Sequence, residues 1–132
     1  MKLTGKKVLV TGGAGFIGSH LVDALIQENC HVRVIDNLSN GKRENIEQHR
    51  SDPRIEFILG NVTDPFDLAA CMEKADIVFH LACLGVRHSI KYPFQNHRVN
   101  SEGTLLVLQE AHKVGIKRFI YCSSSEVYGT AT

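Results

Sequence analysis

A glycine-rich turn near the amino end of the chain has the residue types and spacing of a diphosphate-binding loop. Residues Thr11–Gly18 follow the apolar run Val8–Val10 and lead into a helix-like segment, Phe16–Glu28. Glycines let the backbone turn tightly and approach phosphates, and a helix N-terminus offers free N–H groups with a partial positive charge. Two overlapping patterns, G-x-G-x-x-G and G-x-x-G-x-x-G, are present. Their glycines are Gly12, Gly13, Gly15 and Gly18.

An acidic residue ends the next apolar segment, His31–Asp36. A carboxylate at the tip of the second strand accepts hydrogen bonds from ribose hydroxyls and repels a 2′-phosphate. A turn that only connects a strand to a helix would not need it. The turn and Asp36 together predict a dinucleotide site that prefers NAD to NADP. Lys42 and Arg43 follow closely in the sequence, and a cation near the ribose accommodates a 2′-phosphate. NADP therefore remains the alternative cofactor.

The elements that position this turn alternate between strands and helices. Short apolar strands are typical of a parallel sheet covered by helices on both faces. Right-handed crossovers then give an α/β, Rossmann-type doubly wound sheet with strand order 3-2-1-4-5. We expect strands at Lys7–Thr11, His31–Asp36, Arg54–Leu59, Ile77–Ala82 and Arg118–Ser123, and helices at Phe16–Glu28, Pro65–Lys74 and Phe94–Val114.

Every expected strand ends in small or polar residues. Ligands of doubly wound sheets bind outside the carboxyl ends of the strands, so we expect these residues to meet at one edge. Besides the glycine turn, they are Asp36-Asn37, Asn61-Val62, Leu81-Ala82-Cys83 and Ser123-Ser124-Ser125.

Composition excludes several other classes of protein. A length of 132 residues with 43% hydrophobic residues indicates one globular domain. The net charge of +1 argues against the basic surface of a nucleic-acid-binding protein. No apolar run could span a bilayer and no signal peptide is present, so we expect a cytoplasmic protein. Cysteines and histidines are scattered, which argues against a metal site. We expect Cys71 on a helix and Cys122 in a buried strand.

In six ordered segments the chain resembles the extended short-chain dehydrogenase/reductases, especially the sugar-nucleotide epimerases, dehydratases and decarboxylases. The segments cover nearly the whole chain but only the first part of a full-length family enzyme. They are Thr11–Gly18, Asp36–Gly41, Gly60–Asp64, His80–Ala82, Val99–Thr104 and Ser123–Gly129.

The resemblance implies NAD as the cofactor and gives its contacts particular positions. The backbone of Phe16 and Ile17 should meet the pyrophosphate, and Asp36 should meet the adenosine ribose. Asn61 stands where the family usually has Asp, so the charge there is lost. Asn100 should organise the site or bond to backbone from its helix face. The implied cofactor positions are Gly12, Gly15, Phe16, Ile17, Gly18, Asp36, Asn37, Asn40, Gly41, Asn61, Val62, Leu81, Ala82, Cys83, Asn100 and Ser123.

Ser124 and Glu126 are the catalytic candidates that the resemblance implies. A hydroxyl at Ser124 can bond a sugar hydroxyl and help a tyrosine remove its proton during hydride transfer to the nicotinamide. The Asp36–Gly41 loop is close to the epimerase form, as in UDP-glucose 4-epimerase. Glu126 instead resembles dehydratases and decarboxylases, because typical 4-epimerases have no carboxylate there. An epimerase is favoured, and a dehydratase or decarboxylase remains the alternative.

The family's catalytic Tyr-x-x-x-Lys motif is missing. Tyr92, Tyr121 and Tyr128 are followed four positions later by Asn, Ser and Thr respectively. We therefore expect residues 1–132 to be the NAD-binding domain of a longer enzyme, without the substrate domain. The chain alone should not turn over a UDP- or dTDP-linked sugar. Other readings are a reductase of the same superfamily, which Asp36 disfavours, and a natural non-catalytic NAD-binding module.

We also expect a homodimer. The last expected strand, Arg118–Ser123, has one unpaired edge, and such edges pair readily with other chains. Family dimers commonly use the long helix, here Phe94–Val114. Its apolar face around Val99, Leu106 and Ala111 should lack part of its usual cover.

Overall fold

The computed structural model describes residues 2–130 and has one parallel sheet of five strands. The strand order is β3-β2-β1-β4-β5, which confirms the predicted Rossmann-type topology. The strands are β1 (Lys7–Thr11), β2 (His31–Asp36), β3 (Ile55–Leu59), β4 (Ile77–His80) and β5 (Arg118–Tyr121). The α-helices are α1 (Phe16–Gln27), α2 (Pro65–Met72), α3 (Val86–Lys91), α4 (Pro93–His97) and α5 (Thr104–Lys113).

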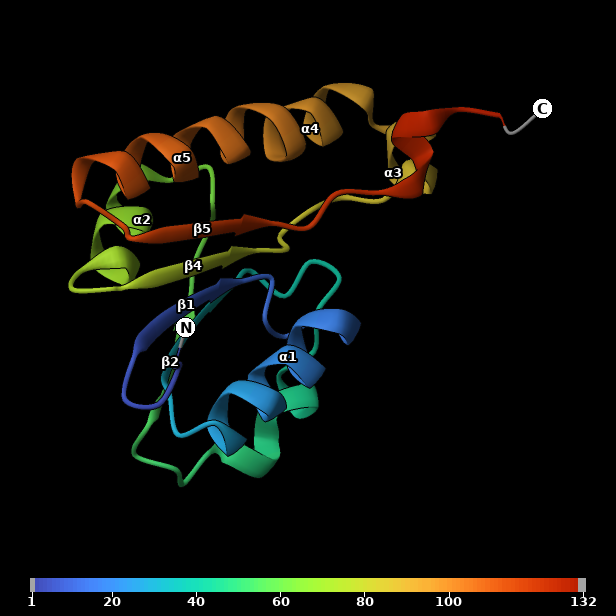
Figure 1. The fold of residues 1–132 in the computed structure, drawn as a ribbon. Helices are drawn as coiled ribbons and strands as arrows, with labels where there is room; N and C mark the ends of the chain where they lie inside the picture. Colours follow the sequence, from blue (N-terminus) through green and yellow to red (C-terminus); the bar gives the residue numbers. More distant parts are fainter. Residues whose placement is uncertain (1, 131–132) are drawn as a thin grey trace.

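Helices cover the sheet on both faces (Figure 1). On one face, α1 and the 3₁₀-helix η1 (Arg43–His49) enclose a core built around Val10, Val22 and Val34. On the other, α2 and α5 enclose a core around Leu9, Leu68 and Val107. Since β1 pairs with both β2 and β4, it lies at the centre of the sheet. The carboxyl end of β1 is therefore surrounded by the ends of its neighbours.

Local sequence explains where α2 begins. The Asp64 carboxylate accepts hydrogen bonds from the Phe66 N–H at 2.8 Å and the Asp67 N–H at 3.3 Å, which caps the helix. Pro65 occupies the first turn, where its missing N–H costs nothing. The observed end at Met72 is two residues before the predicted one.

Two strands end earlier than predicted. β4 stops at His80 instead of Ala82, because the Ala82 N–H turns to the Thr11 hydroxyl at 3.1 Å. The Leu81 N–H is shared between the Thr11 carbonyl and the Thr11 hydroxyl, both at 3.2 Å. β5 stops at Tyr121 instead of Ser123. The expectation that Cys122 is buried in a strand is therefore wrong, since this residue is exposed. Smaller differences are that β3 begins at Ile55 and α1 ends at Gln27.

The predicted long helix is interrupted. A π-helix, η2 (Arg98–Gly103), separates α4 from α5, and a separate helix α3 was not predicted. The π turn brings Gly103 against Val62, where an added Cβ would lie 3.1 Å from a methyl group. Such turns are often found at functional sites.

The apolar face of the predicted helix Phe94–Val114 is partly covered by the rest of the chain. The expectation of an uncovered patch is wrong for Ala111, which is buried, whereas Val99 and Leu106 are partly buried and pack against the second core. The large apolar residues of this segment that are exposed are Phe94, Leu105, Leu108 and Val114, at 90%, 56%, 43% and 41% exposure. The dimer stays a prediction. Within residues 2–130, no helix has the length and apolar character that crossing a bilayer requires.

Candidate functional site

The glycine turn lies between β1 and α1 and packs directly on the chain that follows β4. Gly12 has a φ of +70°, and a Cβ there would lie 2.8 Å from the Ala82 nitrogen. A Cβ on Gly18 would overlap the carbonyl oxygen of Gly12 and lie 2.8 Å from the Gly13 Cα. Only residues without a side chain allow this close packing, so the backbone itself forms the surface of the turn.

The N-terminus of α1 faces outward from this turn. Gly15 is its extended N-cap, and among the described residues no side chain caps it. The first N–H groups of a helix have no partner inside the helix, and they carry a partial positive charge. Phe16 and Ile17 begin the helix and are 80% and 63% exposed. The arrangement can bind an anion such as a diphosphate.

Asp36 ties the end of β2 to the glycine turn. Its carboxylate accepts hydrogen bonds from the Ala14 N–H at 3.0 Å and the Leu38 N–H at 2.8 Å. The side chain is nearly buried, at 8% exposure. A carboxylate has about four acceptor positions, so two remain for a ligand's hydroxyl groups. The Ala14 carbonyl is fixed in turn by the side chain of Asn45 at 2.8 Å.

Residues beyond β2 and β3 form a polar pair at the same edge. The Asn37 amide donates to the Asn61 side-chain oxygen at 2.8 Å, and both residues are exposed. The Asn61 N–H donates to Asp67 at 2.8 Å, which fixes the loop. Val62 is different, because its side chain is buried in the second core and only its backbone can face a ligand.

Asn40 and Gly41 complete the loop after β2. Asn40 is exposed, whereas Gly41 lies under the turn. A Cβ on Gly41 would come within 2.9 Å of Ala14 and 3.0 Å of the Asp36 carboxylate.

Asn100 reaches the site through the backbone after β4. Its side-chain oxygen accepts from the Leu84 N–H at 2.8 Å, and its amide donates to the Leu84 carbonyl at 2.8 Å. Of the two roles predicted for Asn100, the contacts agree with the second, in which its side chain is hydrogen-bonded to backbone. Leu81 and Ala82 are half-buried beside the turn, and Cys83 is exposed.

The two catalytic candidates lie in an exposed segment after β5. Ser124 precedes the 3₁₀-helix η3 (Ser125–Tyr128), and its hydroxyl accepts from the Glu126 N–H at 3.2 Å. Ser123, Ser124 and Glu126 are all exposed. They follow a strand whose neighbour β4 ends beside the glycine turn, so they lie on the expected edge of the sheet.

No function was predicted for His80, which lies behind this edge of the sheet. His80 is 1% exposed, and its Nδ1 is 2.7 Å from the Thr11 hydroxyl. Its Nε2 is 2.9 Å from the Thr104 hydroxyl. Burial lowers the pKa of His80 to about 4. The sequence signal that could have indicated a buried histidine is its position at the end of the apolar strand Ile77–His80.

Burial of neutral His80 should make the protein sensitive to mild acid. The imidazole takes up a proton in the unfolded chain near pH 6.5 but in the folded chain only near pH 4. The free energy of unfolding should therefore fall as the pH drops from about 6.5 to 4, by at most about 3 kcal/mol. Urea unfolding across this window measures the loss. Asp52, whose pKa is held at about 2 by hydrogen bonds from Arg54, titrates below it.

The matched comparison is His80→Asn beside His112→Asn, since His112 is exposed at the end of α5. The variant at His80 should lose most of the pH dependence between 6.5 and 4, and the variant at His112 should keep it. An unchanged slope in the His80 variant would contradict the assignment.

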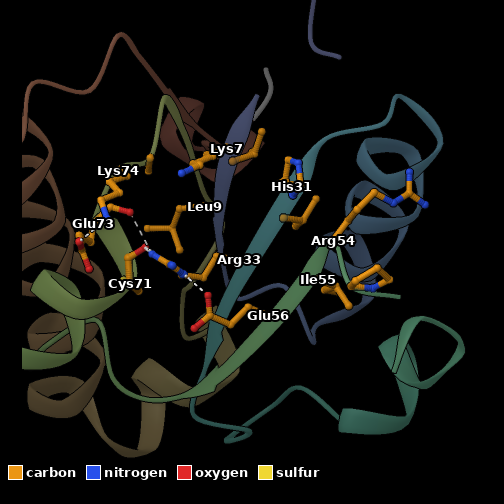
Figure 2. Close-up of a pocket in the computed structure, with 14 residues that line it drawn as sticks. Lys7, Leu9, His31, Arg33, Arg54, Ile55, Glu56, Cys71, Glu73 and Lys74 are labelled. Atoms are coloured by element: carbon orange, nitrogen blue, oxygen red, sulfur yellow. Dashed lines mark hydrogen bonds and ion pairs between the residues drawn. The ribbon is translucent and has the colours of Figure 1, made fainter. Parts of the chain in front are cut away.

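A cavity of about 300 Å³ lies at the opposite edge of the sheet, between the amino ends of β1 to β3 and the end of α2 (Figure 2). Arg33 crosses it, with Nε 2.7 Å from the Glu56 carboxylate and Nη1 3.0 Å from the Cys71 carbonyl. The guanidinium is thus committed to structural contacts. The cavity also lies at the opposite edge of the sheet from the glycine turn, so it is not part of the candidate dinucleotide site.

Metal ligands do not gather in the described part of the chain. Among residues 2–130, no three His, Cys, Asp or Glu side chains lie together as a potential metal site.

Residues 8–132 match the family model of the NAD-dependent epimerase/dehydratase family. The chain is 42% identical over 130 residues to UDP-glucuronic acid decarboxylase 2 of Arabidopsis thaliana, covering 98% of this chain and 28% of that protein. It is 38% identical over 125 residues to a putative UDP-glucose 4-epimerase of Methanocaldococcus jannaschii, covering 92% and 39%. The dTDP-glucose 4,6-dehydratase DesIV of Streptomyces venezuelae, solved with NAD bound, superposes with a TM-score of 0.91 at 36% identity, covering 96% and 42%.

Proposed function

Because the chain belongs to the NAD-dependent epimerase/dehydratase family, we propose that it forms the NAD-binding part of a sugar-nucleotide epimerase similar to UDP-glucose 4-epimerase. The observation that carries the proposal is the glycine turn, packed on the backbone after β4 and joined to Asp36 through Ala14. The chain spans less than half the length of the relatives compared above. The sugar-nucleotide chemistry is therefore proposed for a longer protein.

The residues present fit NAD. The uncapped N-terminus of α1, beginning at Phe16 and Ile17, suits the diphosphate, and the remaining acceptor positions of Asp36 suit the two hydroxyls of the adenosine ribose. Asn37 and Asn61 flank the position that an adenine would take beyond the ribose. NAD, when bound, supplies a reversible hydride acceptor for a sugar carbon.

Preference for NAD over NADP is supported by what lies around Asp36. A 2′-phosphate would meet a carboxylate of like charge. Arg43, which could have offset that charge, lies over the Phe57 ring at 4.7 Å and is engaged there. Lys42 is exposed.

Titration of the chain with both dinucleotides tests the proposal. We expect NAD to bind more tightly than NADP, and Asp36→Ala to weaken NAD binding by about 1–3 kcal/mol, the scale of lost hydrogen bonds to a charged group. Asp76→Ala is the control, because Asp76 lies at the opposite edge and bonds Lys7 and Lys117. It should leave both affinities unchanged. Equal or tighter binding of NADP by the unchanged chain would refute the preference, and no binding of either would refute the site.

A decarboxylase or 4,6-dehydratase is the second candidate, favoured by Glu126. The carboxylate is exposed two residues after Ser124, where it could exchange a proton with a bound sugar. The similarity to UDP-glucuronic acid decarboxylase 2 supports this candidate. A non-catalytic NAD-binding module would use the same glycine turn and Asp36 but would need neither Ser124 nor Glu126.

A further inference from the structure

His80 lies where three elements of the candidate site meet. It ends β4, its Nδ1 contacts Thr11 at the end of β1, and its Nε2 contacts Thr104 at the start of α5. The residue is nearly inaccessible, at 1% exposure, and so cannot contact a ligand itself. Its effect on the site has to pass through these partners.

Hydrogen-bond partners assign the position of the imidazole proton. The Thr11 hydroxyl accepts from the N–H groups of Leu81 at 3.2 Å and Ala82 at 3.1 Å. The Leu81 N–H is shared with the Thr11 carbonyl, also at 3.2 Å, whereas the Ala82 N–H goes to the hydroxyl. With these donors on its oxygen, the hydroxyl has its single hydrogen to give to His80 Nδ1, 2.7 Å away. A proton on Nδ1 would bring a third donor against the same oxygen. The ring is therefore neutral and protonated on Nε2.

The second hydroxyl agrees with this assignment. Thr104 donates its hydrogen to the Asn100 carbonyl at 2.7 Å, which leaves its oxygen free to accept from His80 Nε2. The rings of Phe119 and Tyr121 pack near the imidazole, with centroids 6.0 and 5.7 Å away. The Tyr121 phenol is the titratable group among these described contacts, and no carboxylate among them stabilises a charged imidazole.

We propose that His80, as a neutral Nε2–H imidazole, is a positioning residue that holds the backbone after β4 against the glycine turn. One side of the ring fixes Thr11 and with it Leu81 and Ala82. The latter is the residue whose backbone touches Gly12. The other side fixes the helix turn whose Asn100 bonds Leu84. The inference rests on the proposed function in that the surface so held is the one assigned to NAD.

The proton position is tested on the unliganded chain. Long-range ¹H–¹⁵N correlation spectra of the histidine rings, with His80 assigned by mutation, should show a neutral ring protonated on Nε2 at pH 7. A protonated ring, or a neutral ring protonated on Nδ1, would overturn the proposal.

Thr104→Val and Thr104→Ser separate positioning from packing. Valine has nearly the same shape but cannot accept from Nε2, whereas serine keeps the hydroxyl and loses only a methyl group. With valine we expect faster amide exchange at Leu81 and Ala82 and roughly tenfold weaker NAD binding. With serine both should remain near the values of the unchanged chain. Unchanged exchange and NAD affinity with valine would overturn the proposal, as would equal losses in the two variants.

The two proposals can fail separately. If the unchanged chain does not bind NAD, the proposed function fails, while the proton position and the amide exchange of Leu81 and Ala82 still decide the role of His80. If NAD binds normally but the ring is protonated on Nδ1, only the positioning role fails.

Discussion

Gly18→Ala should abolish NAD binding at concentrations that saturate the unchanged chain. The added Cβ would overlap the Gly12 carbonyl oxygen and lie 2.8 Å from the Gly13 Cα. Both neighbours are backbone, so neither can rotate away. The turn must move from Ala82 or α1 must move from the sheet, and either change displaces the N–H groups offered to a diphosphate. Overpacking of this kind also lowers the free energy of unfolding, by about 1–3 kcal/mol.

Gly85→Ala provides the matched control for this substitution. Gly85 has a φ of −70°, which suits any residue, and a Cβ there would meet nothing within 4 Å. Calorimetric titration with NAD and urea unfolding should find it equal to the unchanged chain. Normal NAD affinity in Gly18→Ala would show that the diphosphate does not bind at this turn.

The topology and the glycine turn could be predicted because their signals are local. Strand β1, the turn and α1 follow one another within Lys7–Gln27, and Asp36 ends the next strand. Right-handed crossovers then leave few arrangements of five parallel strands. The observed order β3-β2-β1-β4-β5 is the simplest of these few.

Features that depend on distant partners could not be predicted. The end of β4 is set by Thr11, whose hydroxyl takes the N–H group of Ala82, 71 residues away. The role of His80 likewise depends on Thr11 and on Thr104, 69 and 24 residues away. Helix α3 has six residues and none of them is buried. Its only apolar residues at helical spacing are Val86 and Ile90, and a single pair is too short a pattern to predict a helix.

In a longer protein that joins this chain to a Tyr-x-x-x-Lys segment, Ser124→Ala should lower kcat for a sugar nucleotide by roughly 10²-fold, the scale of a positioned proton-transfer group. NAD affinity should not change, because the glycine turn and Asp36 make no hydrogen bond to Ser124 in the described chain. Ser124→Thr retains a hydroxyl and is the matched control. Equal turnover in Ser124→Ala and the unchanged protein would exclude Ser124 from the chemistry.

Glu126→Gln in the same protein should distinguish the candidate reactions. Glutamine keeps the shape of the side chain but cannot take up or release a proton, so a dehydratase or decarboxylase that uses Glu126 should lose turnover. An epimerase moves a hydride to NAD and back, and the hydroxyl proton goes to the tyrosine assisted by Ser124. It needs no further acid or base at Glu126, so it should retain most of its rate. The 132-residue chain has no tyrosine followed four positions later by lysine, and assayed alone it should show no turnover. Turnover by that chain would mean that another group within it acts as the base, and the proposed division of NAD binding and catalysis would be wrong.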